Sequence, residues 1–215
     1  MLKFENKIGV FGAGGLGKEA MCYIMDCLSG SKYKIEEIAV FIVDDKYFTE
    51  KTNFGIPVVP LSQFSFANYE ILVAIGESSE RKKIINSLPM DTKFLSLIHP
   101  KSIVSKYAEL AEGVIIAPGA VISCDTKIGK HAVINYNATI GHDCVIGDFF
   151  TASPGANISG RCVIDECVYF GANATIRERI KIFKNVTIGM GAVVVKDIIE
   201  EGTYIGNPAK KLEKK

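Results

Sequence analysis

The sequence has no tryptophan, only three histidines, and no pair of its six cysteines in a CxxC spacing. The 25 Lys and Arg residues nearly cancel the 24 Asp and Glu residues. The net charge of +1 supplies neither a basic field for nucleic acid nor an acidic tail, so no nucleic-acid partner is expected. The cysteine spacing fits neither a zinc site nor a disulfide framework, so we expect no metal.

Long apolar runs are also missing. No stretch approaches the roughly 18 apolar residues that a membrane span needs. The N-terminus, MLKFENKIGVFG, lacks the apolar core and cleavage site of a signal peptide. We therefore expect a cytoplasmic protein with no membrane span. The hydrophobic content of 48% over 215 residues is ample for the core of one or two domains.

What the sequence has in abundance is a six-residue repeat from Ser102 to about Ala209. A bulky aliphatic residue recurs at the third position of each unit, except for Ala152 and Phe170, and most first positions are small or β-branched. Such a repeat predicts a parallel β-helix built from hexapeptides. With three hexads in each coil, residues eighteen apart should stack at roughly 4.8 Å, the spacing between neighbouring strands.

The first hundred residues show a different pattern. Apolar runs at 8–13, 38–43, 56–59 and 70–75 predict short buried strands, and helical spacing at 17–29 and 78–88 predicts two helices. Strands that alternate with helices indicate a small parallel α/β domain, similar to half of a Rossmann fold. We place this domain at residues 1–99 and the β-helix at residues 100–215.

The glycine-rich turn after the first strand is a candidate binding site. Residues 12–17 (GAGGLG) fit the GxGxxG pattern through Gly12, Gly14 and Gly17, with Gly15 between them, and in this pattern backbone N–H groups and a helix N-terminus face a phosphate. At the end of the second strand, Asp44 and Asp45 are placed to bind a ribose hydroxyl or a base edge. The alternative is that the glycines only allow a tight turn.

The candidate catalytic residue of the β-helix is His142, the fifth residue of the unit ATIGHD, which lies at a predicted corner. Its imidazole can act as a general base near neutral pH, although a solvated corner histidine fits the spacing equally well. Gly160, one coil further, could offer its N–H to an acyl carbonyl. Asn135, near the adjacent corner, could orient a polar substrate or simply form a turn. Because a β-helix is convex, a trimer of such prisms would supply the clefts.

Several motifs together resemble a known family. They are VFGAGGLGKEA (10–20), FIVDD (41–45), IGESSERKK (75–83), LIHPKSIVSKYAELAEGVIIAPGAVI (97–122), INYNATIGHDCVIGDF (134–149) and VVVKDIIEEGTYIGNPAKKL (193–212). The hexads are similar to those of left-handed β-helix acyltransferases. The whole layout resembles the sialic acid O-acetyltransferase and bacillosamine N-acetyltransferase group, whose members modify nucleotide-linked sugars.

The resemblance implies a homotrimer with acetyl-CoA bound between adjacent β-helices and a nucleotide sugar held by the glycine turn and Asp44-Asp45. It implies that His142 is the base and that Asp143 assists it. Gly160 would face the thioester carbonyl. The acetyl-CoA site would also include Thr151, Ala172, Met190 and Lys196, with Lys210 near the phosphates. Leu16 stands where the family's glycine turn commonly has histidine, and an apolar side chain there would suit a 6-deoxy sugar.

These expectations favour an enzyme that moves an acetyl group from acetyl-CoA to the amine of a nucleotide-linked 4-amino-4,6-dideoxy sugar. One alternative is O-acetylation of a sialic-acid-type sugar with the same base. Another is a nucleotide-binding module in which the β-helix is only a trimerisation stalk. Release of free CoA thiol in the presence of an amino-sugar nucleotide separates these readings.

Overall fold

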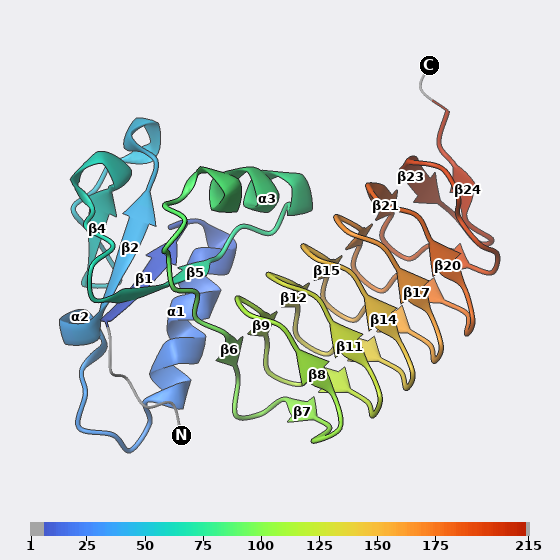
Figure 1. Cartoon of the computed structure of the whole chain (residues 1–215), viewed down its shortest axis with the longest axis horizontal. Helices are drawn as coiled ribbons and strands as arrows, with labels where there is room; N and C mark the ends of the chain where they lie inside the picture. The colour runs from blue at the N-terminus through green and yellow to red at the C-terminus, as the bar shows by residue number, and fades with distance from the viewer. Residues whose placement is uncertain (1–6, 214–215) are drawn as a thin grey trace.

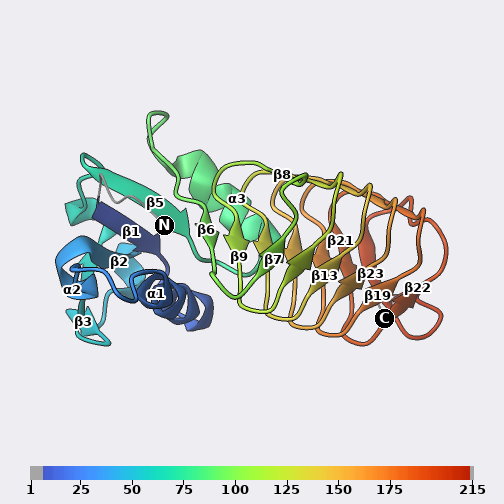
Figure 2. The same cartoon turned by 90° about the horizontal axis from the view of Figure 1, so that it is seen from below.

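A computed structural model describes residues 7–213 of the chain. Residues 1–6, which carry half of the stretch in which we saw no signal peptide, lie outside the described part. The molecule is elongated, with an α/β domain at one end and a stack of triangular coils at the other (Figure 1). The second view shows the coils stacked along one axis (Figure 2). No helix between residues 7 and 213 is long and apolar enough to cross a bilayer.

The N-terminal domain is built on a five-stranded sheet in the order β3-β4-β2-β1-β5. All neighbouring strands are parallel except the pair β3–β4, a short antiparallel edge that the sequence did not indicate. The strands are β1 (Lys7–Phe11), β2 (Ala39–Val43), β3 (Thr52–Asn53), β4 (Ile56–Pro60) and β5 (Tyr69–Val73). The helices are α1 (Gly15–Cys27), α2 (Ile35–Ile38) and α3 (Ser78–Ser87), with the 3-10 turns η1 (Asp45–Tyr47) and η2 (Leu61–Gln63). The predicted strands and helices are therefore present, with ends shifted by a few residues.

The β-helix consists of very short strands joined by corners. Its three sheets contain six, five and eight strands. The first sheet comprises β7 (Ile103–Val104), β10 (Val121–Ile122), β13 (Thr139–Ile140), β16 (Asn157–Ile158), β19 (Thr175–Ile176) and β22 (Val193–Val194). The second comprises β8 (Glu109–Leu110), β11 (Lys127–Ile128), β14 (Val145–Ile146), β17 (Val163–Ile164) and β20 (Lys181–Ile182). The third comprises β6 (Leu97–Ile98), β9 (Ile115–Ile116), β12 (Val133–Ile134), β15 (Thr151–Ala152), β18 (Tyr169–Phe170), β21 (Val186–Ile188), β23 (Gly202–Ile205) and β24 (Lys210–Lys211).

The register confirms the predicted repeat. Val121 pairs with Thr139 and Ile122 with Ile140, so residues eighteen apart are neighbours in a parallel sheet. From Ile116 to Val194 the third-position side chains are at most 3% exposed and form the interior. At Ala152 the missing volume is filled by Phe150 and Phe170, whose rings lie 5.8 Å apart. The expected fold class, a small α/β domain followed by a parallel β-helix, is confirmed.

Three corners separate the sheets, and each keeps its place in every coil. The first corner follows the six-stranded sheet and includes residues 123–126, 141–144 and 159–162. The second follows the five-stranded sheet and includes residues 129–132, 147–150 and 165–168. The third follows the eight-stranded sheet and includes residues 117–120, 135–138, 153–156, 171–174 and 189–192. Most corners contain one residue with positive φ, such as Asp143 at 57°.

The two regions are joined closely. Strand β6 precedes the predicted boundary at 99/100, yet it pairs with β9 in the sheet of the β-helix. The apolar side chains of Ile115 and Val133 on that sheet pack in the same cluster as those of the α/β domain. His99 is buried at the junction, where its Nε2 lies 2.9 Å from an Asp26 carboxylate oxygen on α1. The boundary itself stays a prediction.

Candidate active site

The glycine turn forms one half of the candidate site. Gly12 has a φ of 107°, which favours glycine, and a Cβ on Gly17 would lie 1.9 Å from the Gly12 carbonyl oxygen. These two glycines therefore let α1 start directly against the end of β1. Around Gly14 and Gly15, by contrast, a Cβ would meet nothing within 4 Å. The N-terminal turn of α1 contains no acidic residue and Gly14 provides no side-chain cap, so no side chain of the cap residue occupies the backbone N–H groups at this helix end.

A cavity of about 570 Å³ opens beside this turn. It lies where β1 and β2 end, which is where ligands bind in open parallel sheets. Its volume is within the range of roughly 300–1,000 Å³ typical of small-molecule sites. Its lining combines cations, carboxylates and apolar side chains, and includes Gly12, Gly14, Lys18, Asp44, Lys46, Tyr47, Asn53, Glu80 and Ile84. Such a lining suits a ligand with phosphate groups and a polar heterocycle.

The structure separates the two predicted aspartates. Asp44 lines the cavity and its carboxylate accepts a hydrogen bond from the Lys46 backbone N–H at 3.2 Å. Asp45 does not line it, because its carboxylate accepts hydrogen bonds from the backbone N–H and the hydroxyl of Ser62. These bonds lower the pKa of Asp45. Leu16 also lies outside the lining, half-buried against the core of the α/β domain.

The second half of the candidate site is at the first corner of the β-helix. His142 Nδ1 lies 2.6 Å from an Asp143 carboxylate oxygen, and both side chains are about half exposed. The hydrogen bond to His142 and the Arg161 guanidinium 3.7 Å away lower the pKa of Asp143, which therefore remains a carboxylate near neutral pH. An ionised Asp143 accepts a hydrogen bond from the Nδ1–H of His142, and in this tautomer the lone pair is on Nε2.

Gly160 lies directly beneath this imidazole. A Cβ on Gly160 would lie 2.8 Å from His142 Nε2 and 2.9 Å from its Cε1. Only a residue without a side chain allows the ring to sit here. Gly160 is buried, and its backbone N–H makes no hydrogen bond within residues 7–213. One coil of the β-helix thus places a base next to an unused hydrogen-bond donor.

The other predicted acetyl-CoA residues are spread over several edges. Lys196 follows Gly160 by 36 positions, or two coils, on the first corner. Ala172 and Met190 stack on each other at the third corner, where Asn135 also lies, and Met190 is 83% exposed. Lys210 is on β24, past the last coil. One chain therefore does not bring all of these residues together.

Thr151 lies apart from the others, in the contact between α3 and the β-helix. It is 2% exposed, and its hydroxyl lies 3.0 Å from the Gly76 carbonyl oxygen and 3.2 Å from the Ser78 hydroxyl. The Arg81 guanidinium donates to the same hydroxyl at 3.0 Å. These partners leave Thr151 little capacity to bind a ligand.

Arg81 is a residue that the sequence analysis missed. It is 1% exposed and donates to the backbone carbonyls of His131, Ile75, Gly76, Phe149 and Phe150 at 2.5–3.2 Å. Burial lowers its pKa to about 10. Neighbouring Lys82 pairs with Glu166 at 2.7 Å. Because Glu80 and Ile84 of the same helix line the cavity, α3 fixes one wall of the cavity to the β-helix (Figures 1 and 2).

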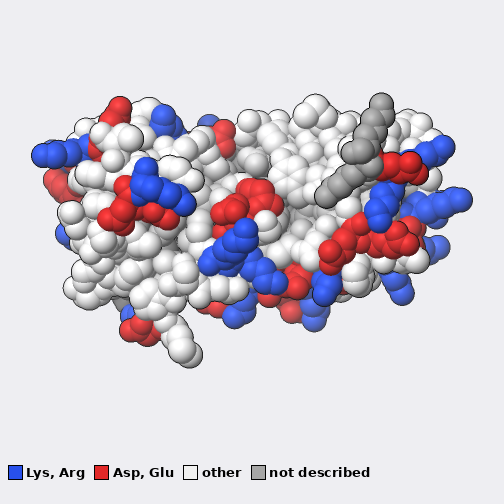
Figure 3. All heavy atoms as spheres, turned by 90° about the horizontal axis from the view of Figure 1, so that it is seen from above, with Lys and Arg blue, Asp and Glu red and all other residues white. Residues whose placement is uncertain are grey.

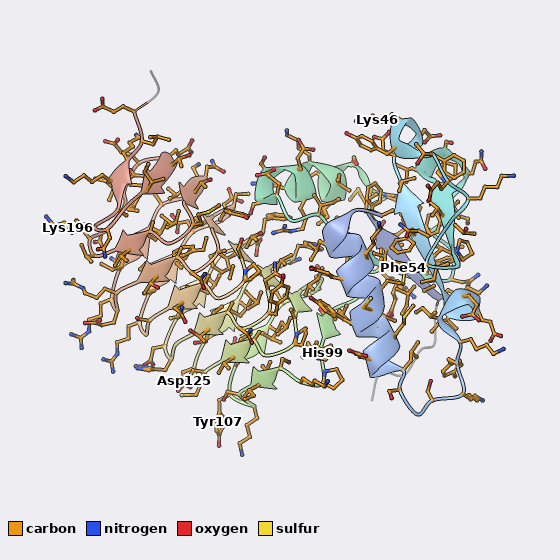
Figure 4. The ribbon with its side chains drawn as sticks, turned by 180° about the vertical axis from the view of Figure 1, so that it is seen from behind. Lys46, Phe54, His99, Tyr107, Asp125 and Lys196 are labelled. Atoms are coloured by element: carbon orange, nitrogen blue, oxygen red, sulfur yellow. The ribbon has the colours of Figure 1, made fainter. Side chains whose placement is uncertain are left out.

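The cavity and His142 are far apart in a single chain. Asp125, one coil before Asp143, marks the first corner, and Lys46 marks the cavity; Figure 4 shows them on opposite sides of the molecule. On the face drawn in Figure 3, acidic and basic side chains are interspersed, with no large field of one sign. No cluster of three or more metal-binding side chains occurs in the described 7–213 segment.

Comparison with known proteins places this geometry in a family. Residues 7–88 match the model of the PglD N-terminal domain. The acetyltransferase domain of PglB from Neisseria gonorrhoeae is 32% identical over 97% of this chain and 100% of its own, with a TM-score of 0.85. The chain belongs to this family of nucleotide-sugar acetyltransferases. A search of curated proteins found no match.

Two further members of the family match over the whole length. WeeI from Acinetobacter baumannii is 32% identical, with 96% of this chain and 99% of its own covered and a TM-score of 0.87. PerB from Caulobacter crescentus, solved with CoA and GDP-perosamine, is 27% identical, with 97% and 98% covered and a TM-score of 0.84. The PglB acetyltransferase domain has also been solved with acetyl coenzyme A. The predicted family, and acetyl-CoA as its co-substrate, are therefore confirmed.

Proposed function

We propose that this acetyltransferase moves the acetyl group of acetyl-CoA to the amine of a nucleotide-linked 4-amino-4,6-dideoxy sugar. The observation that carries the proposal is the arrangement of His142, Asp143 and Gly160 at one corner of the β-helix. It combines a free imidazole nitrogen with a free N–H donor, the two groups that a direct acyl transfer requires. That PerB was solved with CoA and GDP-perosamine supports an amino-sugar nucleotide as the acceptor.

The reaction needs no covalent enzyme intermediate. The neutral sugar amine attacks the thioester carbonyl carbon, and Nε2 of His142 takes the proton that the nitrogen loses as the C–N bond forms. Asp143 holds the imidazole by its Nδ1–H and stabilises the imidazolium. The Gly160 N–H donates to the oxyanion. Collapse of the tetrahedral intermediate breaks the C–S bond, and the departing CoA sulfur receives the proton from His142.

The cavity at the glycine turn would hold the nucleotide. The N-terminal N–H groups of α1 and the ammonium of Lys18 are suited to the phosphates, and the carboxylate of Asp44 can accept from a base or ribose. The Gly14 and Gly15 backbone is open to the ligand because no side chain intervenes. Asp45 plays a supporting part, since Ser62 already occupies its carboxylate.

The active site would be completed by a second copy of the chain. In one chain Lys46, which lines the cavity, and Asp125, on the same corner as His142 one coil earlier, lie on opposite sides (Figure 4). Gly160 and Lys196 lie on one corner, whereas Ala172 and Met190 lie on another. A homotrimer that sets the first corner of one protomer against the third corner of its neighbour would form a cleft for acetyl-CoA. Within it, Lys196 and Lys210 would face the phosphates.

A panel of nucleotide sugars tests the function. We expect release of free CoA thiol with 4-amino-4,6-dideoxy sugars linked to UDP, dTDP or GDP, and one of these should also raise the melting temperature in the presence of CoA. The matched control is the same nucleotide sugar with a hydroxyl in place of the 4-amine. Turnover of the hydroxyl sugar alone would replace N-acetylation with O-acetylation. Binding of nucleotides without any CoA binding would contradict the proposal.

A further inference from the structure

The first corner differs from the other two in the side chains beneath it. At the second and third corners, the first-position residues from Val114 to Ala192 are apolar, among them Val168, Val186, Ala138 and Ala156, each 0% exposed. At the first corner three successive coils carry Thr126, Cys144 and Cys162, also 0% exposed. Polar hydrogens are therefore buried below the one corner that carries His142 and Gly160.

Thr126 makes specific contacts with the turn that holds His142. Its hydroxyl donates to the Gly141 carbonyl oxygen at 2.7 Å and accepts from the Cys144 backbone N–H at 3.3 Å. A longer contact of 3.4 Å reaches the Cys124 carbonyl oxygen. Gly141 and Cys144 bracket His142 and Asp143 in the sequence. One buried hydroxyl thus binds the peptide groups on both sides of the candidate base and its carboxylate.

The third corner is held by a different hydrogen bond. There, the N–H of the first-position residue bonds to the carbonyl three residues earlier, as Ala138 does to Asn135 at 3.1 Å and Ala174 to Gly171 at 3.0 Å. The corresponding bond in the His142 turn would join Cys144 N–H to the Gly141 oxygen, and the structure does not contain it. The hydroxyl of Thr126 takes up both groups instead, so the turn is held by the coil before it.

In the next two coils, cysteine thiols at the same position contact the corresponding backbone carbonyls. The Cys144 thiol lies 3.2 Å from the carbonyl oxygen of Ser159, the residue before Gly160, and the Cys162 thiol lies 3.3 Å from that of Arg177. A thiol is a weak donor compared with a hydroxyl. The strong donor is beneath His142, whose ring must keep its direction for proton transfer.

We infer that Thr126 is a positioning residue for the acetyl transfer, acting through the turn of His142. The inference rests on the proposed role of His142 as general base. Thr126 touches no substrate, but its hydroxyl fixes the two peptides from which the imidazole and the Asp143 carboxylate project. Without it, a buried N–H and a buried carbonyl lose their partner and the turn must rearrange.

The test compares three substitutions at Thr126. Thr126→Val keeps the shape and removes the hydroxyl, so we expect kcat to fall about 10- to 100-fold, since small misplacements of reacting groups have such effects. The KM values for both substrates should change by less than about twofold, because no binding group is lost. Thr126→Ser keeps the hydroxyl and should restore kcat to near the wild-type value. Thr126→Cys introduces the residue found at the same position in the next two coils, Cys144 and Cys162, and its kcat should lie between those of Thr126→Val and Thr126→Ser.

Two controls make the result decisive. Val186→Ala, at the second corner, removes buried volume without a corner hydrogen bond, and it should lower the melting temperature while keeping kcat. If Thr126→Val does not fold, Thr126→Cys replaces it, because thiols are already accommodated at this position in the next two coils. Wild-type kcat in the folded variants that lack the hydroxyl would overturn the inference.

His142→Asn separates the inference from the proposed function. Loss of turnover in His142→Asn together with normal kcat in Thr126→Val would overturn the role of Thr126 and leave the function intact. Normal turnover in His142→Asn would show that His142 is not the base, and the positioning role would fail with it. Loss of kcat in both, with rescue by Thr126→Ser, is the expected result.

Discussion

The α/β domain and the β-helix differ in the kind of surface that each offers to a ligand. The α/β domain forms a cavity of about 570 Å³ within a single chain, from the ends of β1 and β2 and one face of α3. The β-helix is a convex prism, and its candidate base, about half exposed, projects from a corner. A convex surface does not enclose a substrate by itself, so in the proposed mechanism the catalytic half of the site would be completed by a neighbouring protomer.

This difference also appears in how each region uses glycine. At Gly17 the missing side chain lets α1 approach the Gly12 carbonyl, which is a requirement of the fold. At Gly160 the missing side chain makes room for the His142 ring, which is a requirement of the site. The α/β domain therefore uses backbone geometry to shape a cavity, and the β-helix uses its repeat distance to set two functional groups one coil apart.

The largest expected effect comes from disabling each region in a separate chain. His142→Asn removes the proposed base, and general-base catalysis contributes about 10²- to 10⁴-fold, so kcat should fall by that amount. Gly14→Trp places a large side chain at a position that lines the cavity and where a Cβ meets nothing within 4 Å, so nucleotide-sugar binding should be lost. Thiol-release assays on each variant, with CoA binding as the control, check these results.

Mixing the two inactive variants then tests whether the regions belong to one site. After joint unfolding and refolding at equal amounts, about a quarter of the interfaces in a cyclic trimer would pair an intact cavity with an intact histidine. Activity should return to about that fraction of the wild type. A mixture as inactive as its parts would mean that each chain builds its whole site alone.

The next effect is expected on stability, from the contact between the two regions. Arg81→Met removes the guanidinium that binds five backbone carbonyls, three of them across the junction in the β-helix. Buried polar groups left without partners cost about 1–3 kcal/mol each, so the free energy of unfolding should fall by about 3 kcal/mol or more. Urea titration measures it. Lys83→Met, on the exposed face of the same helix, is the control and should change it little.

Arg81 also marks the limit of what the sequence revealed. The repeat of one aliphatic per hexad predicted the β-helix, its register and the stacking of His142 on Gly160, because those relations depend only on spacing along the chain. The backbone carbonyls that Arg81 binds lie 5 to 69 residues away, and no local sequence pattern predicts a long-range bond to a backbone carbonyl. Likewise, nothing in the sequence distinguished Asp44, at the cavity, from Asp45, which binds Ser62.

A smaller effect, on the pH dependence of stability, is expected from His131, the buried histidine of the β-helix. His131 is 4% exposed between Phe94 and Phe149, and burial lowers its pKa from 6.5 to about 4. Between these values the unfolded chain binds more protons, so stability rises with pH and is lost as pH falls through the window. Allowing for screening by solvent, the loss is roughly 2 kcal/mol. His131→Gln should flatten this part of the stability profile in urea titrations, whereas an unchanged slope would assign it to other groups.

The smallest effects on kcat and KM are expected from replacing one glycine in each region with alanine. Gly160→Ala places a methyl group 2.8 Å from His142 Nε2, and since its backbone φ is not positive, the imidazole rather than the fold should yield. We expect kcat to fall about tenfold with little change in melting temperature. In Gly15→Ala, at the start of α1, the added methyl group meets nothing in the protein and the helix propensity improves, so the fold should not suffer. Because the methyl group would stand where the proposed ligand approaches the backbone, the KM for the nucleotide sugar should rise and kcat should not change. If both substitutions changed only KM, the division between a binding region and a catalytic edge would be wrong.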